Sequence, residues 1–253
     1  MPLLHPDDPG PFSVHQPNLK SPLLISCDHA GSKIPSALGN LGLNPTDLQR
    51  HIAYDIGAEQ VAIALAKHFS CPLICGVYSR LVVDLNRHPN DPSIMPAVSD
   101  GTAVPANANL SASAVETRLN EIFRPYHQAH GKLVTAAKAQ FKRPVIFSVH
   151  SFTPTMNGKD RPWHYGVLWD RDEDLAVRVI RQLGMLTHRV VGDNQPYTAA
   201  SPRGYSLDVH ALANDVEILI LEIRQDLISD APGRAAIVDE LVSSLGPVFE
   251  TLT

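Results

Sequence analysis

The sequence predicts an α/β protein with a mixed, mainly parallel sheet between two layers of helices. Short apolar runs at 145–149 and 216–223 have the length and β-branched composition of buried strands. Segments with apolar residues three and four positions apart separate such runs, which is typical of amphipathic helices. Because strands that are apolar at almost every position need cover on both faces, we expect a three-layer αβα sandwich.

The elements follow in order along the chain. Residues 1–21 are rich in proline and polar residues, which predicts an irregular N-terminal arm, and residues 22–253 are expected to form one domain. The predicted strands are 23–26, 73–77, 81–83, 145–149, 165–169 and 216–223. The predicted helices begin near Asp55, near Ser113 and after Asp170, and a last one contains Ile237 to Val248. The proline- and asparagine-rich segment 91–108 is a candidate lid.

Composition excludes several classes of function. The chain has 253 residues, 44% hydrophobic and 19% charged, with a net charge of −5. Its Lys and Arg residues are scattered, so we expect neither a nucleic acid nor a membrane partner. The first residues do not resemble a signal peptide, which predicts a cytoplasmic protein. The three cysteines lie in apolar stretches and are expected to be buried thiols.

Polar residues gather where predicted strands end. The four segments are Asp28-His29, Asp84-Leu85-Asn86-Arg87, His150-Ser151 and Glu222-Ile223-Arg224-Gln225-Asp226. Two imidazoles can bind zinc, one carboxylate can orient an imidazole, and another can deprotonate water. Arginine pairs through two parallel hydrogen bonds with a substrate carboxylate. These residue types together predict metal-assisted hydrolysis of an anionic substrate.

The motifs resemble, in order, the pattern of the N-formylglutamate amidohydrolase family. They are Ser26-Cys27-Asp28-His29-Ala30-Gly31, Tyr54-Asp55-Ile56-Gly57-Ala58, Ser79 to Arg87, Val149 to Pro154, Gly192 to Tyr197 and Glu222 to Leu227. The resemblance spans roughly residues 22 to 230. That family is similar to zinc carboxypeptidases and aspartoacylase, which implies their kind of three-layer fold.

The resemblance implies a role for each residue. His29 and His150 are expected to bind Zn²⁺ or another divalent transition metal, with Asp84 bracing His29. Glu222 is expected to act as general base and then acid, and Arg80 to stabilise the oxyanion. The expected substrate-binding residues are Asn86, Arg87, Ser151, Arg224, Asn194 and Tyr197. The implied substrate is a small anionic N-acyl amino acid, with N-formyl-L-glutamate giving formate and glutamate.

The third metal ligand departs from the carboxypeptidase pattern. That pattern has His-x-x-Glu, whereas Ser32 stands three residues after His29. Asp55 is the preferred substitute, and Asp28 and Glu59 are the alternatives.

Several structural interpretations stay open. His29 and His150 could be hydrogen-bonded structural residues, Asp84 could pair with Arg87, and Glu222 with Arg224. His127 and His130 are expected at the surface of a helix and His164 in a solvated loop, while Asp193 to Tyr197 could be an Asx turn. Two other functions are compatible with the residues. They are a carboxypeptidase-like peptidase and a non-catalytic carboxylate-binding protein without metal.

Overall fold

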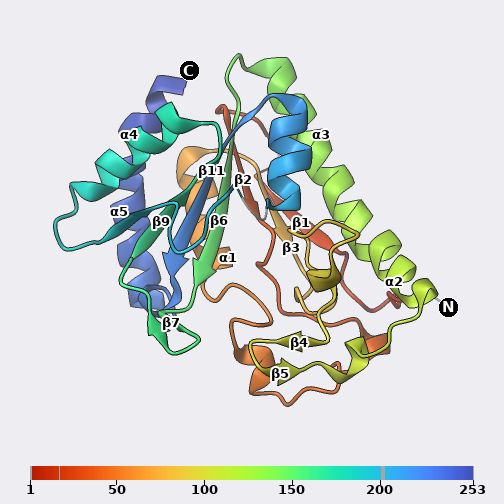
Figure 1. The fold of residues 1–253 in the computed structure, drawn as a ribbon. Coiled ribbons are helices and arrows are strands. Elements are labelled where there is room, and N and C mark those ends of the chain that lie inside the picture. Colours follow the sequence, from red (N-terminus) through yellow and green to blue (C-terminus); the bar gives the residue numbers. More distant parts are fainter. Residues whose placement is uncertain (1, 17, 201–202, 253) are drawn as a thin grey trace.

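The computed structural model describes residues 2–16, 18–200 and 203–252 and is built on a seven-stranded sheet (Figure 1). In spatial order the strands are β1 (Phe12–His15), β3 (Leu73–Gly76), β2 (Leu23–Cys27), β6 (Val145–Phe152), β11 (Glu217–Arg224), β9 (Tyr165–Leu168) and β10 (Val191–Asp193). The four strands β3, β2, β6 and β11 are parallel, and β1, β9 and β10 run the other way. The predicted mixed, mainly parallel sheet is confirmed.

Helices cover both faces of the sheet (Figure 1). One face packs against α1 (Ala58–Phe69), α4 (Glu173–Gly184) and α5 (Ala231–Phe249). The other packs against a long helix made of α2 (Ala112–Arg118), a π-helical turn (Leu119–Phe123) and α3 (Arg124–Gln140). No helix within the described ranges is long and apolar enough to cross a membrane.

Short elements complete the chain. Two small hairpins join β4 (Val98–Ser99) to β5 (Thr102–Ala103) and β7 (Thr155–Met156) to β8 (Lys159–Asp160). A π-helical turn, η6, spans Leu207–Ala211. Single 3₁₀ turns occupy Ser36–Leu38, Asp47–Gln49, Pro92–Ile94, Pro105–Asn107, Leu212–Asn214, Gln225–Leu227 and Glu250–Leu252.

The alternation of side chains along the central strands separates two environments. Odd-numbered residues such as Phe147 and Leu221 join the apolar core beneath α1, α4 and α5. Even-numbered residues face α3, where Ile146 and Ile218 pack near the strand beginnings. Toward the carboxyl ends this second face becomes polar.

The structure differs from the predicted elements in two segments, residues 12–15 and residues 81–83. Residues 12–15 of the expected irregular arm form β1, which pairs with β3 at the sheet edge. Residues 81–83 are buried but form a turn rather than a strand. Their carbonyl groups accept hydrogen bonds from side chains, with Asn107 donating to Leu81 and Arg118 to Val82. Apolar content here marks burial and not a strand.

Candidate active site

A cavity of about 730 Å³ opens beyond the carboxyl ends of β2, β6 and β11. Parallel strands present ligands at this edge, so the position is the one expected of such a sheet. The predicted site residues that line it are His29, Asp55, Arg80, Asp84, Asn86, Arg87, His150, Ser151, Asn194, Tyr197 and Glu222. The 91–108 segment contributes Ser99 and Asp100 to the wall, as its candidate role as a lid requires.

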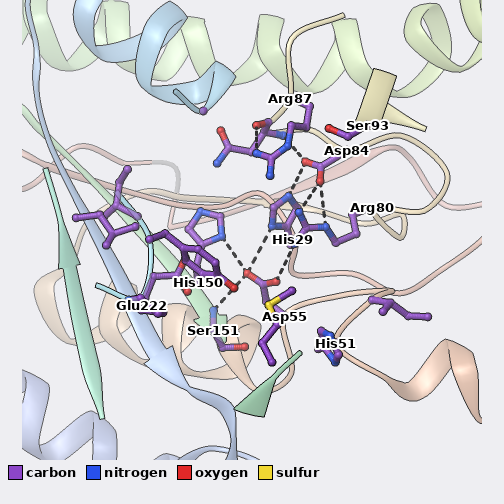
Figure 2. A pocket seen from close by; sticks show the side chains of 18 of the residues that line it. His29, His51, Asp55, Arg80, Asp84, Arg87, Ser93, His150, Ser151 and Glu222 are labelled. Atoms are coloured by element: carbon purple, nitrogen blue, oxygen red, sulfur yellow. Dashed lines mark hydrogen bonds and ion pairs between the residues drawn. The ribbon is translucent and has the colours of Figure 1, made fainter. Parts of the chain in front are cut away.

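Asp55 lies between the two predicted histidine ligands (Figure 2). His150 Nδ1 donates to Asp55 Oδ2 at 2.9 Å, and His29 Nδ1 lies 3.5 Å from the same oxygen. Donor atoms of all three buried side chains lie within 4.8 Å of one another. Two imidazoles and a carboxylate are a common donor set for divalent transition metals.

Local backbone contacts hold this arrangement. Asp55 N donates to the His29 carbonyl group at 2.9 Å, and Ser151 N donates to Asp55 Oδ2 at 3.3 Å. A Cβ on Gly31 would lie 1.9 Å from the Val77 carbonyl oxygen, so only glycine lets the turn after His29 approach this closely.

Asp84 fixes the far side of His29. His29 Nε2 donates to Asp84 Oδ1 at 2.8 Å, which leaves Nδ1 directed toward Asp55. Arg80 donates to the other oxygen of Asp84 through Nε at 3.0 Å and Nη2 at 2.6 Å. The Asn86 backbone N–H adds a third donor to Asp84. Asp84 therefore pairs with Arg80 and not with Arg87, and segment 84–87 is a turn.

The charges of the cluster reinforce one another. Burial alone would lower the pKa of His150, but the hydrogen bond to Asp55 and the nearby carboxylates raise it to about 9. Burial would raise the pKa of Asp55, yet the two histidines hold it far below its usual range. The ionised carboxylate of Asp55 therefore favours positive charge on or beside the two imidazoles.

Glu222 stands next to His150 across the sheet. The two residues are register partners in β11 and β6, so both side chains reach the same face. The side chain is 8% exposed, and its Oε2 has no hydrogen-bond partner. Burial raises the pKa of Glu222 to about 7, although the charge of His150 opposes the shift. A carboxylate with this pKa can accept and return a proton near neutral pH.

The remaining predicted residues differ in how they face the cavity. Arg87 donates to the Asn86 carbonyl group at 3.1 Å and, among the described residues, forms no ion pair. Asn86 and Asn194 each use their amide oxygen to accept backbone N–H groups. Tyr197 accepts a hydrogen bond from Arg161 at 2.8 Å. These hydrogen bonds fix the orientations of the side chains that line the cavity.

Arg224 does not line the cavity, so its predicted place at the substrate is not reproduced. Its guanidinium group binds Asp226 at 2.8 Å and lies within 3.4 Å of the carbonyl oxygens of Arg161 and Pro162. It is the last residue of β11, so its long side chain reaches past the strand end to a carboxylate two residues onward. It does not pair with Glu222.

The comparison with known families matches residues 21–229 to the family described as N-formylglutamate amidohydrolase. This chain belongs to that family. The matched range contains every residue of the cluster described above.

Two curated relatives of this chain are both named N-formylglutamate deformylase. The N-formylglutamate deformylase of Pseudomonas aeruginosa is 31% identical over 147 residues, which are 51% of this chain and 52% of that protein. The deformylase of Pseudomonas putida is 28% identical over 157 residues, 55% of this chain and 54% of that protein. The matches thus span about half the length of these curated relatives.

Two crystal structures resemble the whole chain. The gene product Atu2144 from Agrobacterium tumefaciens has a TM-score of 0.94 at 30% identity, covering 98% of both chains. The N-formylglutamate amidohydrolase from Ralstonia eutropha JMP134 has a TM-score of 0.73 at 21% identity, covering 96% of this chain and 98% of that one. The second likeness shows the fold alone.

The candidates for a third metal ligand differ in how close they lie to His29 and His150. Ser32 is exposed and does not line the cavity. Asp28 Oδ1 accepts a hydrogen bond from Tyr126, and its Oδ2 lies 4.0 Å from the far nitrogen of His150. Glu59 lies in α1 and accepts a hydrogen bond from the Gln60 side chain. Of the candidates, only Asp55 joins both histidines.

Some residues of the cavity were not predicted from the sequence, and two histidines do not lie where they were predicted. His51 and Asp100 line the cavity but were not predicted to do so. Asp100 lies in the candidate lid, so its position in the sequence could have indicated its place in the cavity wall. His164 accepts a hydrogen bond from the Val190 N–H and does not line the cavity. His127 and His130, predicted at the surface, are buried. Both continue the apolar face of Phe123 and Tyr126, so the helical periodicity already contained the signal.

Proposed function

We propose that this chain is a metal-dependent amidohydrolase that cleaves a small N-acyl amino acid, with N-formyl-L-glutamate as the first substrate to test. The convergence of His29, Asp55 and His150 beside the unpartnered carboxylate of Glu222 carries the proposal. The deformylase names of the Pseudomonas relatives favour the formyl group and glutamate. The resulting products are formate and L-glutamate.

The residues present fit a divalent metal. His29 Nδ1 is buried without a hydrogen-bond partner, and His150 Nδ1 holds its proton against Asp55. A cation in place of that proton satisfies both imidazoles and the carboxylate, and Zn²⁺ is the first choice for this donor set. A bound zinc ion supplies polarisation of an amide carbonyl group and makes water more acidic.

The protein residues then divide the remaining work. Glu222 is placed to take the proton from the attacking water and to return it to the leaving amine. Arg80 brings positive charge to the cavity wall beside Asp84, where it can oppose charge developing on the carbonyl oxygen. Ser151 positions Asp55 through its backbone N–H and donates its hydroxyl to the Ile56 carbonyl group.

The substrate carboxylates require positive charge and hydrogen-bond donors. Arg87 is the guanidinium group in the cavity wall that is not engaged with a carboxylate, within the part of the chain described. Its planar group suits a carboxylate of an acylated glutamate. Asn86 is its neighbour in the chain, and Asn194 and Tyr197 also line the cavity.

The test joins metal content to product release. We would measure bound metal by elemental analysis and formate release from N-formyl-L-glutamate for the wild type, His150→Ala and the control His164→Ala. We expect His150→Ala to lose about one equivalent of metal and its activity. His164 lies in a loop outside the cavity, so His164→Ala should keep both the bound metal and the activity.

Other outcomes identify the alternatives. Release of a C-terminal residue from short peptides, without formate release, would favour the peptidase. No bound metal in the wild type, with stabilisation by glutamate but no hydrolysis, would replace the hydrolase by a carboxylate-binding protein. Metal with activity on N-acetyl-L-glutamate instead would keep the reaction and correct the acyl group.

A further inference from the structure

A second group of buried histidines lies on the α3 side of the sheet. His127 and His130 come from α3, and His210 from η6, which Figure 1 shows as the short blue helix beside the green α3. Their exposed fractions are 8%, 0% and 2%. One nitrogen from each lies within 4.8 Å of the others. None of the three lines the active-site cavity.

The hydrogen bonds fix how the first two rings are oriented. His127 Nε2 lies 2.9 Å from the Leu85 carbonyl oxygen, which only accepts, so this nitrogen carries a proton. His127 Nδ1 then faces His210 Nε2 at 2.9 Å with a lone pair. An imidazole that donates one N–H to a backbone carbonyl and presents the other nitrogen is the usual arrangement of a metal ligand.

His130 is the unexplained member. It is fully buried, neither of its nitrogens has a hydrogen-bond partner, and its ring centroid lies 3.9 Å from that of His210. A buried imidazole without partners is costly, and a packing role alone would favour an apolar residue. The spacing of three along α3 puts it on the same face as His127.

We propose that His127, His130 and His210 form a second metal site for Zn²⁺ or a chemically similar divalent ion. Three histidines are a known zinc donor set. The negative charge that such an ion needs is nearby, because the Tyr126 side chain, next to His127, donates to buried Asp28. The other oxygen of Asp28 has no hydrogen-bond partner and lies 4.0 Å from His150 Nε2, on the side of the first site.

The site would connect two segments that are far apart in the sequence. His210 lies six residues after Gly204, which lines the active-site cavity, whereas His127 and His130 belong to the long helix. A metal shared by them would hold residues 204–210 against α3. Because the three rings are nearly inaccessible, we expect the ion to enter during folding and to exchange slowly.

The test counts metal in four proteins expressed with added zinc: the wild type, His130→Leu, His150→Ala and the double variant. Leucine keeps the volume of His130 but removes its nitrogens. We expect about two, one, one and no equivalents, respectively. If the wild type and His130→Leu bind the same amount, the proposal is wrong.

A cobalt measurement keeps the test valid even if His130→Leu does not fold. His150→Ala leaves the second group intact, so expression with Co²⁺ should give one equivalent and visible absorption bands of cobalt bound to nitrogen. His150→Ala without bound cobalt would overturn the second site. Because this readout does not involve formate release, it distinguishes failure of the second site from failure of the proposed amidohydrolase.

Discussion

Replacing Glu222 with glutamine tests the buried carboxylate and its role as a base together. Glutamine keeps the shape of the side chain and removes its charge. Burial raises the pKa of Glu222 to about 7 from an ordinary value of 4.5, so the folded protein prefers the protonated form. Stability from this group is therefore present at low pH and is lost as the pH rises through about 7. The two pKa values correspond to a difference on the order of 2 to 3 kcal/mol between pH 5 and pH 8.

We would measure urea unfolding of the chelator-treated wild type and Glu222→Gln at pH 5 and pH 8. The stability of the glutamine variant relative to the wild type should rise by roughly 2 to 3 kcal/mol over this range. Formate release should fall by about 10²- to 10⁴-fold with metal content unchanged. Glu222→Asp keeps a carboxylate and should retain more activity than glutamine. A stability difference that does not change with pH, or near-normal activity of the glutamine variant, would refute this account.

Three further predictions concern individual contacts. Asp84→Asn removes the negative charge that braces protonated His29 Nε2 and should weaken metal binding by about 10- to 100-fold in a chelator competition, whereas unchanged affinity would exclude the bracing role. Arg87→Ala should raise KM about 10- to 100-fold by removing a bond to a carboxylate, and Arg224→Ala, already paired with Asp226, should leave KM nearly unchanged. Glu240→Gln removes the negative charge and one of the two oxygens that accept from Arg189 and Tyr165, and should lower the free energy of unfolding by about 2 kcal/mol at pH 7. Those partners lower the pKa of Glu240 to about 2, so its advantage over glutamine, measured by urea unfolding, should fade between pH 4.5 and pH 2.

The fold was predictable because its central strands are buried on both faces. Runs such as 145–149, apolar at every position except Ser148, are expected only when helices cover both sides of the strand, and the structure has that arrangement. Edge strand β1 escaped prediction because four half-exposed residues carry little pattern. The turn at 81–83 was mistaken for a strand because side chains, rather than a neighbouring strand, satisfy its carbonyl groups.

The active-site residues were predictable as types, but their pairing was not. Strand ends identified His29, His150 and Glu222, because the parallel strands that carry or precede them end at one edge. Asp55 reaches the same edge from the loop before α1, through a backbone bond to His29 that no local pattern encodes. The partner of Asp84 was likewise undetermined, since Arg80 and Arg87 are both close in sequence. Only the turn that contains them decides between the two.

The two faces of the sheet explain why chemistry gathers on one of them. Along β2, β6 and β11, odd-numbered residues meet α1, α4 and α5 in an apolar core, and the buried polar residues Ser26, Asp28, Ser148, His150 and Glu222 are all even-numbered. Each polar side chain on the α3 face needs a partner, and the long helix supplies Tyr126 to Asp28. His127 and His130 extend the same polar layer beneath the helix. The apolar face can therefore stabilise the sheet by packing, while the α3 face carries the buried carboxylates, imidazoles and hydrogen bonds.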